Sequence, residues 1–329
     1  MKRRQDSMVL TTFLGCVFAM SAGAQNAYVD QPFLQDFSEK VPLAPSVGDA
    51  KLLKVRADRN DHISVLSDKG LLQVHEGRLV PDRLHRPVAD MHVVDIETHD
   101  GQFVYLTDDL VLSDAWAGKL LVEHQVSGAH CLVMGKDADF LVVGDKQSVL
   151  FHDGKPVQDW KQRASDVKQG VFYSERDRYL LLTISTIEVL GRNMNETLFF
   201  ELAQVNCFDF SRDGRTLLVG TWRGYGQRDP NSLRPLGDLL QKLPCTDIRT
   251  IRAIGDTIWF GTPEGAFSLH PDGRIDCYAS KRWLVDDMAI DIAPGPRDSV
   301  LVLTEKGLNV IRFKEMTLAD KADHFDKAM

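Results

Sequence analysis

The pattern that recurs along this chain is clearest in Thr257-Ile258-Trp259-Phe260-Gly261-Thr262-Pro263-Glu264-Gly265-Ala266-Phe267-Ser268-Leu269. An apolar run ends at a Gly-Thr pair, a short turn follows, and a second apolar run begins. With Thr262 as the reference position, the counterparts in the other copies are Ser67, Thr107, Gly144, Thr183, Thr221 and Thr304. These positions are 37 to 42 residues apart. A period of about 40 residues made of short β-like segments is typical of a β-propeller, in which each copy forms one sheet, or blade.

Each copy is long enough to form four short strands. Around the clearest copy, residues 248–254 and 257–261 predict the first two strands and residues 266–269 the third. The turn Pro271-Asp272-Gly273 leads to an outer strand over 274–278. Some copies are less regular, since Gln147 and Thr186 stand where Gly265 stands. We therefore predict an all-β, seven-bladed β-propeller over residues 51–315.

The segment Ile258-Trp259-Phe260-Gly261-Thr262-Pro263-Glu264-Gly265 resembles the short repeat of the two-component regulator propeller family. Lys69-Gly70-Leu71 and Lys306-Gly307-Leu308 are similar to the second half of that repeat, and the resemblance spans roughly residues 51–313. Propellers of that family are similar to periplasmic sensing modules, often for carbohydrate, that are fused to kinase or cyclase parts. The resemblance implies a ligand-sensing propeller, although no kinase, cyclase or membrane segment follows it here.

The N-terminal 24 residues have the composition of a secretory signal peptide. Lys2-Arg3-Arg4 is a basic start, an apolar stretch follows over residues 8–20, and Ala22-Gly23-Ala24 is a small-residue cleavage site. A lipoprotein anchored through Cys16 is the alternative. We expect an exported protein, periplasmic or extracellular, with no membrane-spanning segment after cleavage.

Two terminal segments flank the repeats. Residues 25–50 contain three prolines and predict an extended strap that either completes a blade or lies across the ring. Residues 316–329 predict a C-terminal helix, with Thr317 as the N-cap and Asp320 three residues later. Such a helix leads into a further domain in some similar propellers, so a shortened relative of a multidomain protein is a second interpretation.

Charge and composition exclude several functions. The formal net charge of −8 disfavours nucleic acid as a partner. We expect no cofactor and no metal, because the sequence contains no phosphate-binding loop and no Cys/His cluster with metal-ligand spacing. Cys131 and Cys207 fall in predicted inner strands of different blades and are expected to be buried thiols rather than a disulfide.

Three aspartates stand between apolar neighbours in predicted first strands, and we expect them to line the central channel: Asp95, Asp209 and Asp291. A buried carboxylate needs a polar partner. One interpretation gives these residues a cation or polar ligand in the channel. The favoured one has each carboxylate accept backbone N–H groups from the neighbouring blade.

A second group of candidates is aromatic and basic. Trp222, Arg223, Tyr225 and Arg228 belong to an unusual insert, and Arg282 and Trp283 lie in the link between the sixth and seventh copies. Ring stacking and bidentate guanidinium bonds suit a sugar or a carboxylate.

Two functions follow from these features. The favoured one is a non-catalytic module that binds an oligosaccharide or a protein partner. The alternative is a carbohydrate-active enzyme, a polysaccharide lyase or glycosidase, at the channel mouth. The enzyme would be favoured if two or more of His92, His130 and Tyr173 met Arg223 in one deep pocket.

Overall fold

The structure is a computed structural model, and its described residues are 32–83, 88, 91–113, 120–137, 139–161, 166–191, 198–201 and 204–326. The predicted signal peptide and Cys16 lie outside these residues. The chain divides into a large compact unit, Gln35–Lys314, and a second unit made of residues from both ends of the chain.

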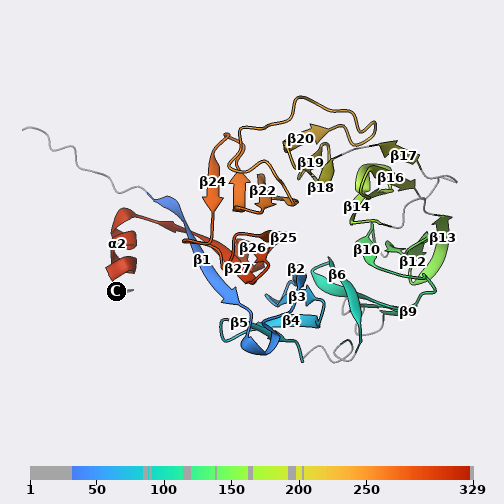
Figure 1. The fold of residues 1–329 in the computed structure, drawn as a ribbon, viewed down its shortest axis with the longest axis horizontal. Coiled ribbons are helices and arrows are strands. Elements are labelled where there is room, and N and C mark those ends of the chain that lie inside the picture. Colours follow the sequence, from blue (N-terminus) through green and yellow to red (C-terminus); the bar gives the residue numbers. More distant parts are fainter. Residues whose placement is uncertain are drawn as a thin grey trace, which may run out of the picture. The chain divides into compact units, whose positions relative to one another are not determined.

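The described part of the large unit forms seven antiparallel sheets, one for each repeat, arranged around a centre (Figure 1). Blade 1 contains β2 (Leu52–Ala57), β3 (Ile63–Ser67), β4 (Gly70–His75) and β5 (Arg78–Pro81). Blade 2 contains β6 (Val93–His99), β7 (Gln102–Thr107), β8 (Leu110–Ser113) and β9 (Leu120–Glu123). Blade 3 contains β10 (Cys131–Met134), β11 (Asp139–Val143), β12 (Gln147–His152) and β13 (Lys155–Lys161).

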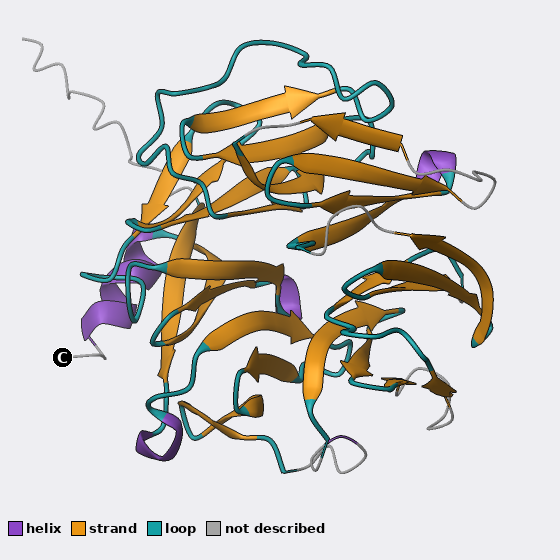
Figure 2. Cartoon of the chain, turned by 45° about the vertical axis from the view of Figure 1, so that its right-hand side comes forward, coloured by secondary structure: helices purple, strands orange, loops and turns teal. Residues whose placement is uncertain are grey.

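The remaining blades follow in chain order. Blade 4 contains β14 (Gln169–Tyr173), β15 (Arg178–Leu182), β16 (Thr186–Gly191) and β17 (Leu198–Glu201). Blade 5 contains β18 (Val205–Phe210), β19 (Leu217–Thr221) and β20 (Gly224–Arg228). Blade 6 contains β21 (Thr250–Ile254), β22 (Thr257–Thr262), β23 (Gly265–Leu269) and β24 (Ile275–Tyr278). Blade 7 contains β25 (Ala289–Pro294), β26 (Val300–Thr304), β27 (Gly307–Met316) and β1 (Phe33–Pro42). The prediction of an all-β, seven-bladed propeller is confirmed, and strands dominate the molecule (Figure 2).

The structure explains why a hydroxyl recurs at the reference position in six of the seven repeats, all but that of Gly144. Thr262 Oγ1 donates a hydrogen bond to the Gly265 carbonyl at 2.8 Å and accepts the Glu264 N–H at 3.1 Å, which closes the turn between the second and third strands. The same bond to the carbonyl three residues later is made by Ser67, Thr107, Thr183, Thr221 and Thr304. Gly265 has a φ of +114°, and a Cβ there would lie 2.3 Å from the Tyr278 carbonyl oxygen, so this turn requires glycine.

The ring is closed by strands from both ends of the chain. In blade 7 the hydrogen-bonded order is β1-β27-β26-β25, so β1 supplies the outer strand of the sheet that holds the last three strands. Glu39 in β1 pairs with Arg312 in β27 at 2.5 Å. The strap therefore completes a blade, which is one of the two arrangements that the sequence left open.

Blade 5 differs from the four-strand pattern of the other sheets. Its described residues contain three strands, and the fourth position is occupied by an irregular segment held through the isolated bridges Tyr225↔Leu240 and Arg228↔Pro235. Leu236, Leu239 and Leu240 are exposed there.

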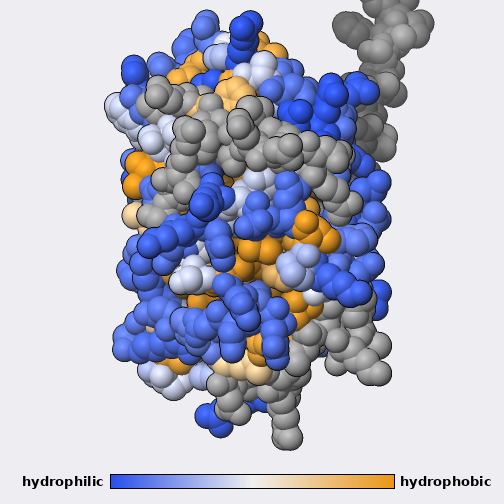
Figure 3. All heavy atoms as spheres, turned by 90° about the vertical axis from the view of Figure 1, so that its right-hand side faces the viewer, coloured by the Kyte–Doolittle hydropathy of each residue, from blue (hydrophilic) through white to orange (hydrophobic). Residues whose placement is uncertain are grey.

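Large apolar side chains fill the space between the sheets. Trp259 is 2% exposed and stacks on Tyr278, with the ring centroids 5.1 Å apart. Viewed from the flank of blades 3 and 4, the surface is mainly hydrophilic, with apolar atoms interspersed (Figure 3).

The second unit contains the C-terminal helix α2 (Leu318–Asp326), which confirms the expected short helix. Asp320 donates its N–H to Thr317 Oγ1 at 3.1 Å, and its carboxylate accepts the Thr317 N–H at 3.0 Å. This reciprocal pair caps the first turn. No helix among the described residues is long and apolar enough to cross a membrane.

Candidate binding site at the central channel

The strand order defines two faces of the propeller. Because consecutive strands of a blade are antiparallel, turns between the second and third strands lie at the same end as the links between blades. We call this end the entrance face, and every inner strand begins there. The opposite face carries the turns between the first and second strands.

A cavity of about 380 Å³ runs into the centre of the ring from the inner strands of all seven blades. This volume is in the range of small-molecule sites, which is about 300–1,000 Å³. The register of the inner strands assigns the wall residues to layers at successive depths from the entrance face. The mouth layer consists of Leu53, Val94, His130, Lys168, Asn206, Arg249 and Ile290. The second layer, next along each strand, consists of Lys54, Asp95, Cys131, Gln169, Cys207, Thr250 and Asp291.

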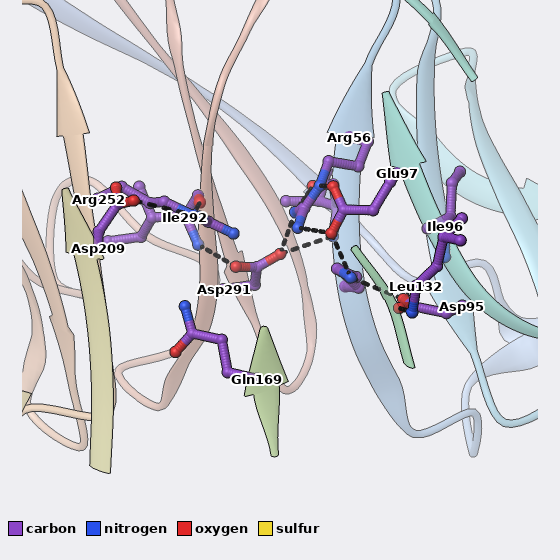
Figure 4. Close-up of polar contacts among 12 residues, drawn as sticks. Arg56, Asp95, Ile96, Glu97, Leu132, Gln169, Asp209, Arg252, Asp291 and Ile292 are labelled. Atoms are coloured by element: carbon purple, nitrogen blue, oxygen red, sulfur yellow. Dashed lines mark hydrogen bonds and ion pairs between the residues drawn. The ribbon is translucent and has the colours of Figure 1, made fainter. Parts of the chain in front are cut away.

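Asp95 and Asp291 occupy matching places in the second layer and make matching hydrogen bonds. Each uses one carboxylate oxygen for the next N–H of its own strand, at 2.8 and 2.9 Å. The other oxygen accepts an N–H from the following blade: Leu132 binds Asp95 at 2.8 Å, and Val55 binds Asp291 at 3.0 Å. These are the inter-blade bonds that the favoured interpretation predicts (Figure 4).

Asp209 lies elsewhere, which corrects the expectation of three equivalent positions. It pairs with Leu218, two residues further from the entrance face than the second layer. It still accepts the N–H groups of Phe210 at 2.9 Å and of Ala253, in the next blade, at 2.9 Å. Asp209 is outside the cavity lining, so its role is to join blades 5 and 6.

The sequence analysis missed an ion-pair network that the structure places in this channel. Arg56 of blade 1 binds the Glu97 carboxylate with two nitrogens, both at 2.9 Å, and its third contact is with Asp291 of blade 7 at 2.9 Å. Lys54 pairs with Asp95 at 2.7 Å and with Glu97 at 2.6 Å. The network therefore links blades 7, 1 and 2 (Figure 4).

The network changes the acidity of its carboxyl groups in opposite directions. Burial raises the pKa of Asp95 above its ordinary value, despite the nearby Lys54 charge. Burial alone would also raise the pKa of Glu97, but the charges of Arg56 and Lys54 outweigh it and hold that pKa well below the usual range. Glu97 is therefore the ionised centre of the network at neutral pH.

The thiols of the channel are protonated at neutral pH. Burial raises the pKa of Cys131 to about 12 and raises that of Cys207 as well. All four described cysteines are free, and the described residues contain no cluster of His, Cys, Asp or Glu that could hold a metal ion.

The aromatic and basic candidates do not form one group. Trp222 is 52% exposed in the second turn of blade 5, on the entrance face, and the Arg223 guanidinium lies 5.4 Å from its ring centroid. Tyr225 is buried and packs edge-to-face on Phe260 at 5.2 Å. Arg228 lies at the far end of β20, where Nη1 donates to the Leu233 carbonyl at 2.7 Å.

A second Trp–Arg pair lies in the link between blades 6 and 7, also on the entrance face. The Arg282 guanidinium lies 4.5 Å from the Trp283 ring centroid. Trp283 is half-buried, because its ring packs edge-to-face on Tyr278 at 5.5 Å. Of the six candidates, Trp222, Arg223, Arg282 and Trp283 therefore share a face.

The three candidate residues of the enzyme alternative lie apart. His92 is exposed and faces Asp108 at 3.1 Å. His130 lies in the channel mouth. Tyr173 ends β14 on the opposite face and donates its hydroxyl to Glu175 at 2.9 Å. Arg223 is not part of the cavity lining, so these residues do not assemble into one pocket.

Comparison with known proteins extends only to the fold. No family model matches the chain, and no curated protein matches its sequence. Among solved structures, a streptogramin B lyase aligns with a TM-score of 0.64 and 12% identity over 86% of this chain and 98% of that chain. The WD40 domain of Neurospora crassa Pan2 aligns with a TM-score of 0.63 and 11% identity over 87% of this chain and 96% of that one.

A third similar structure comes from a signalling protein. The extracellular domain of a hybrid two-component system from B. thetaiotaomicron aligns with a TM-score of 0.62 and 11% identity. The alignment covers 85% of this chain but 42% of that one. At these identities the likeness establishes the propeller fold, which serves a lyase, a WD40 domain and an extracellular domain of a two-component system alike.

Proposed function

We propose that the protein is an exported, non-catalytic propeller that binds an oligosaccharide on its entrance face. Export is inferred from the signal-peptide pattern of residues 1–24. The sugar is inferred from the two Trp–Arg pairs on this face, since indole rings stack on sugar faces and guanidinium groups bind hydroxyl or carboxylate oxygens.

The observation that carries the proposal is the exposure of Trp222. A tryptophan that only fills space between sheets is buried, as Trp259 is at 2% exposure. Trp222 instead keeps 52% of its surface exposed, with a cation beside its ring. A large apolar ring held in water next to a guanidinium is typical of a recognition surface.

The resemblance to two-component regulator propellers supports the same conclusion. The similar structure from B. thetaiotaomicron is an extracellular domain of such a system. We infer that this chain acts as a sensing or interaction module, with a larger assembly or partner that responds to the bound ligand.

A glycan array tests the proposal with a matched pair of variants. Trp222→Ala is expected to lower the array signal at least tenfold, because stacking on the ring is lost. Ile184 occupies the same turn position in blade 4 and is 62% exposed, so Ile184→Ala is the control and is expected to leave the signal unchanged. For both variants the free energy of unfolding is expected to lie within about 0.5 kcal/mol of the wild-type value, as is usual for surface substitutions.

Two results would contradict this assignment. One is a large loss of stability in Trp222→Ala, which would make the ring a packing element. The other is an array that shows no ligand while pull-down with the same variants identifies a protein that depends on Trp222, which would replace the sugar by a protein partner.

A further inference from the structure

The seven residues of the mouth layer divide into two arcs of opposite chemistry. Three consecutive blades, 7, 1 and 2, contribute aliphatic side chains: Ile290, Leu53 and Val94. The other four, blades 3 to 6, contribute His130, Lys168, Asn206 and Arg249. No carboxylate belongs to this layer of the described lining.

In four of the blades the mouth residue is the extra residue of a β-bulge, a geometry that Leu53, Val94 and Ile290 share with the polar Asn206. The register shifts at these positions in blades 1, 2, 5 and 7, between Leu52 and Lys54, Val93 and Asp95, Val205 and Cys207, and Ala289 and Asp291. The extra residue of such a bulge is unpaired and its side chain is redirected. Leu53 is 39% exposed as a result. Covering an aliphatic surface at the open end of a polar channel with an apolar group lowers the free energy, because both apolar surfaces leave water.

The polar arc offers positive charge and hydrogen-bonding capacity. Lys168 is exposed and has no ion pair within the described part of the chain. One Arg249 nitrogen binds Asp247 at 2.7 Å, which holds the guanidinium while its other nitrogens remain for a ligand. His130 Nδ1 lies 2.8 Å from the Gly128 carbonyl and must donate to it, whereas the buried Nε2 has no partner among the described residues.

Asp247 offsets the charge of Arg249, but the acidic groups of the channel itself are paired elsewhere. Asp95, Glu97 and Asp291 lie deeper, on the side of blades 7 and 2, and are paired with Lys54 and Arg56. Among the described residues, Lys168 is therefore the unpaired charge of the mouth, in a chain whose net charge is −8.

From these two arcs we infer that the channel mouth binds a small organic carboxylate with a short aliphatic tail. Lys168 and Arg249 hold the carboxylate, and the tail lies across the mouth on Leu53, Val94 and Ile290. An inorganic anion would leave the aliphatic arc uncovered, and a neutral apolar molecule would leave the lysine without a partner. This site is distinct from the Trp222 surface and does not depend on it.

Isothermal titration calorimetry with sodium hexanoate tests the inference. Hexanoate is expected to bind at least tenfold more tightly than hexan-1-ol, which has the same tail without the charge. In the series from acetate to hexanoate, affinity is expected to rise about fourfold for each methylene that the aliphatic arc covers. Equal binding of hexanoate and hexan-1-ol, or no binding of hexanoate, would overturn the inference.

Two variants assign the binding to the mouth. Lys168→Gln is expected to lower hexanoate affinity at least tenfold, whereas Lys146→Gln, an exposed lysine in the second turn of blade 3 outside the cavity, leaves it unchanged. Leu53→Ser is expected to reduce the gain per methylene while acetate binding is retained. Equal losses in the two lysine variants would show that hexanoate responds only to overall charge and would refute the site.

The two proposals fail separately. Trp222→Ala is expected to bind hexanoate like the wild type, and Lys168→Gln is expected to keep its glycan-array signal. Loss of hexanoate binding in Trp222→Ala would refute the separation of the two sites.

Discussion

Two sides of the same channel are built in contrasting ways. On the side of blades 7, 1 and 2, buried ion pairs join neighbouring inner strands, with Arg56 at the centre. On the side of blades 3 and 4, the equivalent positions hold neutral residues, such as Cys131 in the second layer and Val133 two residues deeper. The propeller geometry therefore does not require charge at its centre. The charge is concentrated where the last blade meets the first.

The largest expected effect comes from removing the centre of the charged side. Arg56→Met leaves Asp291 without its ion pair and Glu97 with Lys54 alone. Breaking a buried pair in this way costs about 3–5 kcal/mol. Arg252→Met is the matched variant on the opposite side of blade 7, where the guanidinium is 3.9 Å from Asp209 and more exposed, and is expected to cost about 1 kcal/mol. Urea unfolding measures both, and equal losses would show that the network adds no particular stability.

A smaller and pH-dependent effect is expected for Glu97→Gln. The pKa of Glu97 in the folded protein is below its ordinary value, so its ionised form stabilises the fold. That contribution is complete above the ordinary glutamate pKa of about 4.3, begins to fall below it, and is fully lost only when the pH passes below the lowered pKa of the folded state. The variant is expected to lose about 2 kcal/mol at pH 7, and this deficit is expected to shrink progressively as the pH falls from about 4 toward 2. A difference that stays constant between pH 3 and 7 would contradict this.

The smallest effect is expected on the neutral side. Cys131→Ala removes a buried thiol that behaves as a small apolar group, and about 1 kcal/mol of unfolding free energy should be lost at any pH between 4 and 8. A loss as large as that of Arg56→Met would show that the two sides contribute equally, and the contrast between them would disappear.

The spacing of Thr262 and its counterparts was enough to predict the fold. Each of those hydroxyls closes a turn, so a local requirement recurs with the period of the blade. The missing outer strand of blade 5 was not predicted. Pro230 and Pro235 follow β20, and proline lacks the N–H that a strand needs, so the sequence did contain a sign of the irregular segment.

The channel was predictable only in part. Val94-Asp95-Ile96 and Phe208-Asp209-Phe210 look alike, yet strand register places their carboxylates two residues apart. A bulge adds one residue without a sequence signature, so register could not be inferred from one chain. The sequence did contain a sign of the ion-pair network. Charged residues alternate with apolar ones in Lys54-Val55-Arg56 and Asp95-Ile96-Glu97, and alternate residues of a strand face the same way.

The pairing of β1 with β27 also bears on how this protein matures. Blade 7 lacks its outer strand until residues about 270 positions apart in the chain have both emerged and met. A nascent chain can therefore form its middle blades early but must keep the strap unpaired until β27 has been synthesised. Any machinery that moves this polypeptide across a membrane as an open chain would have that interval in which to act.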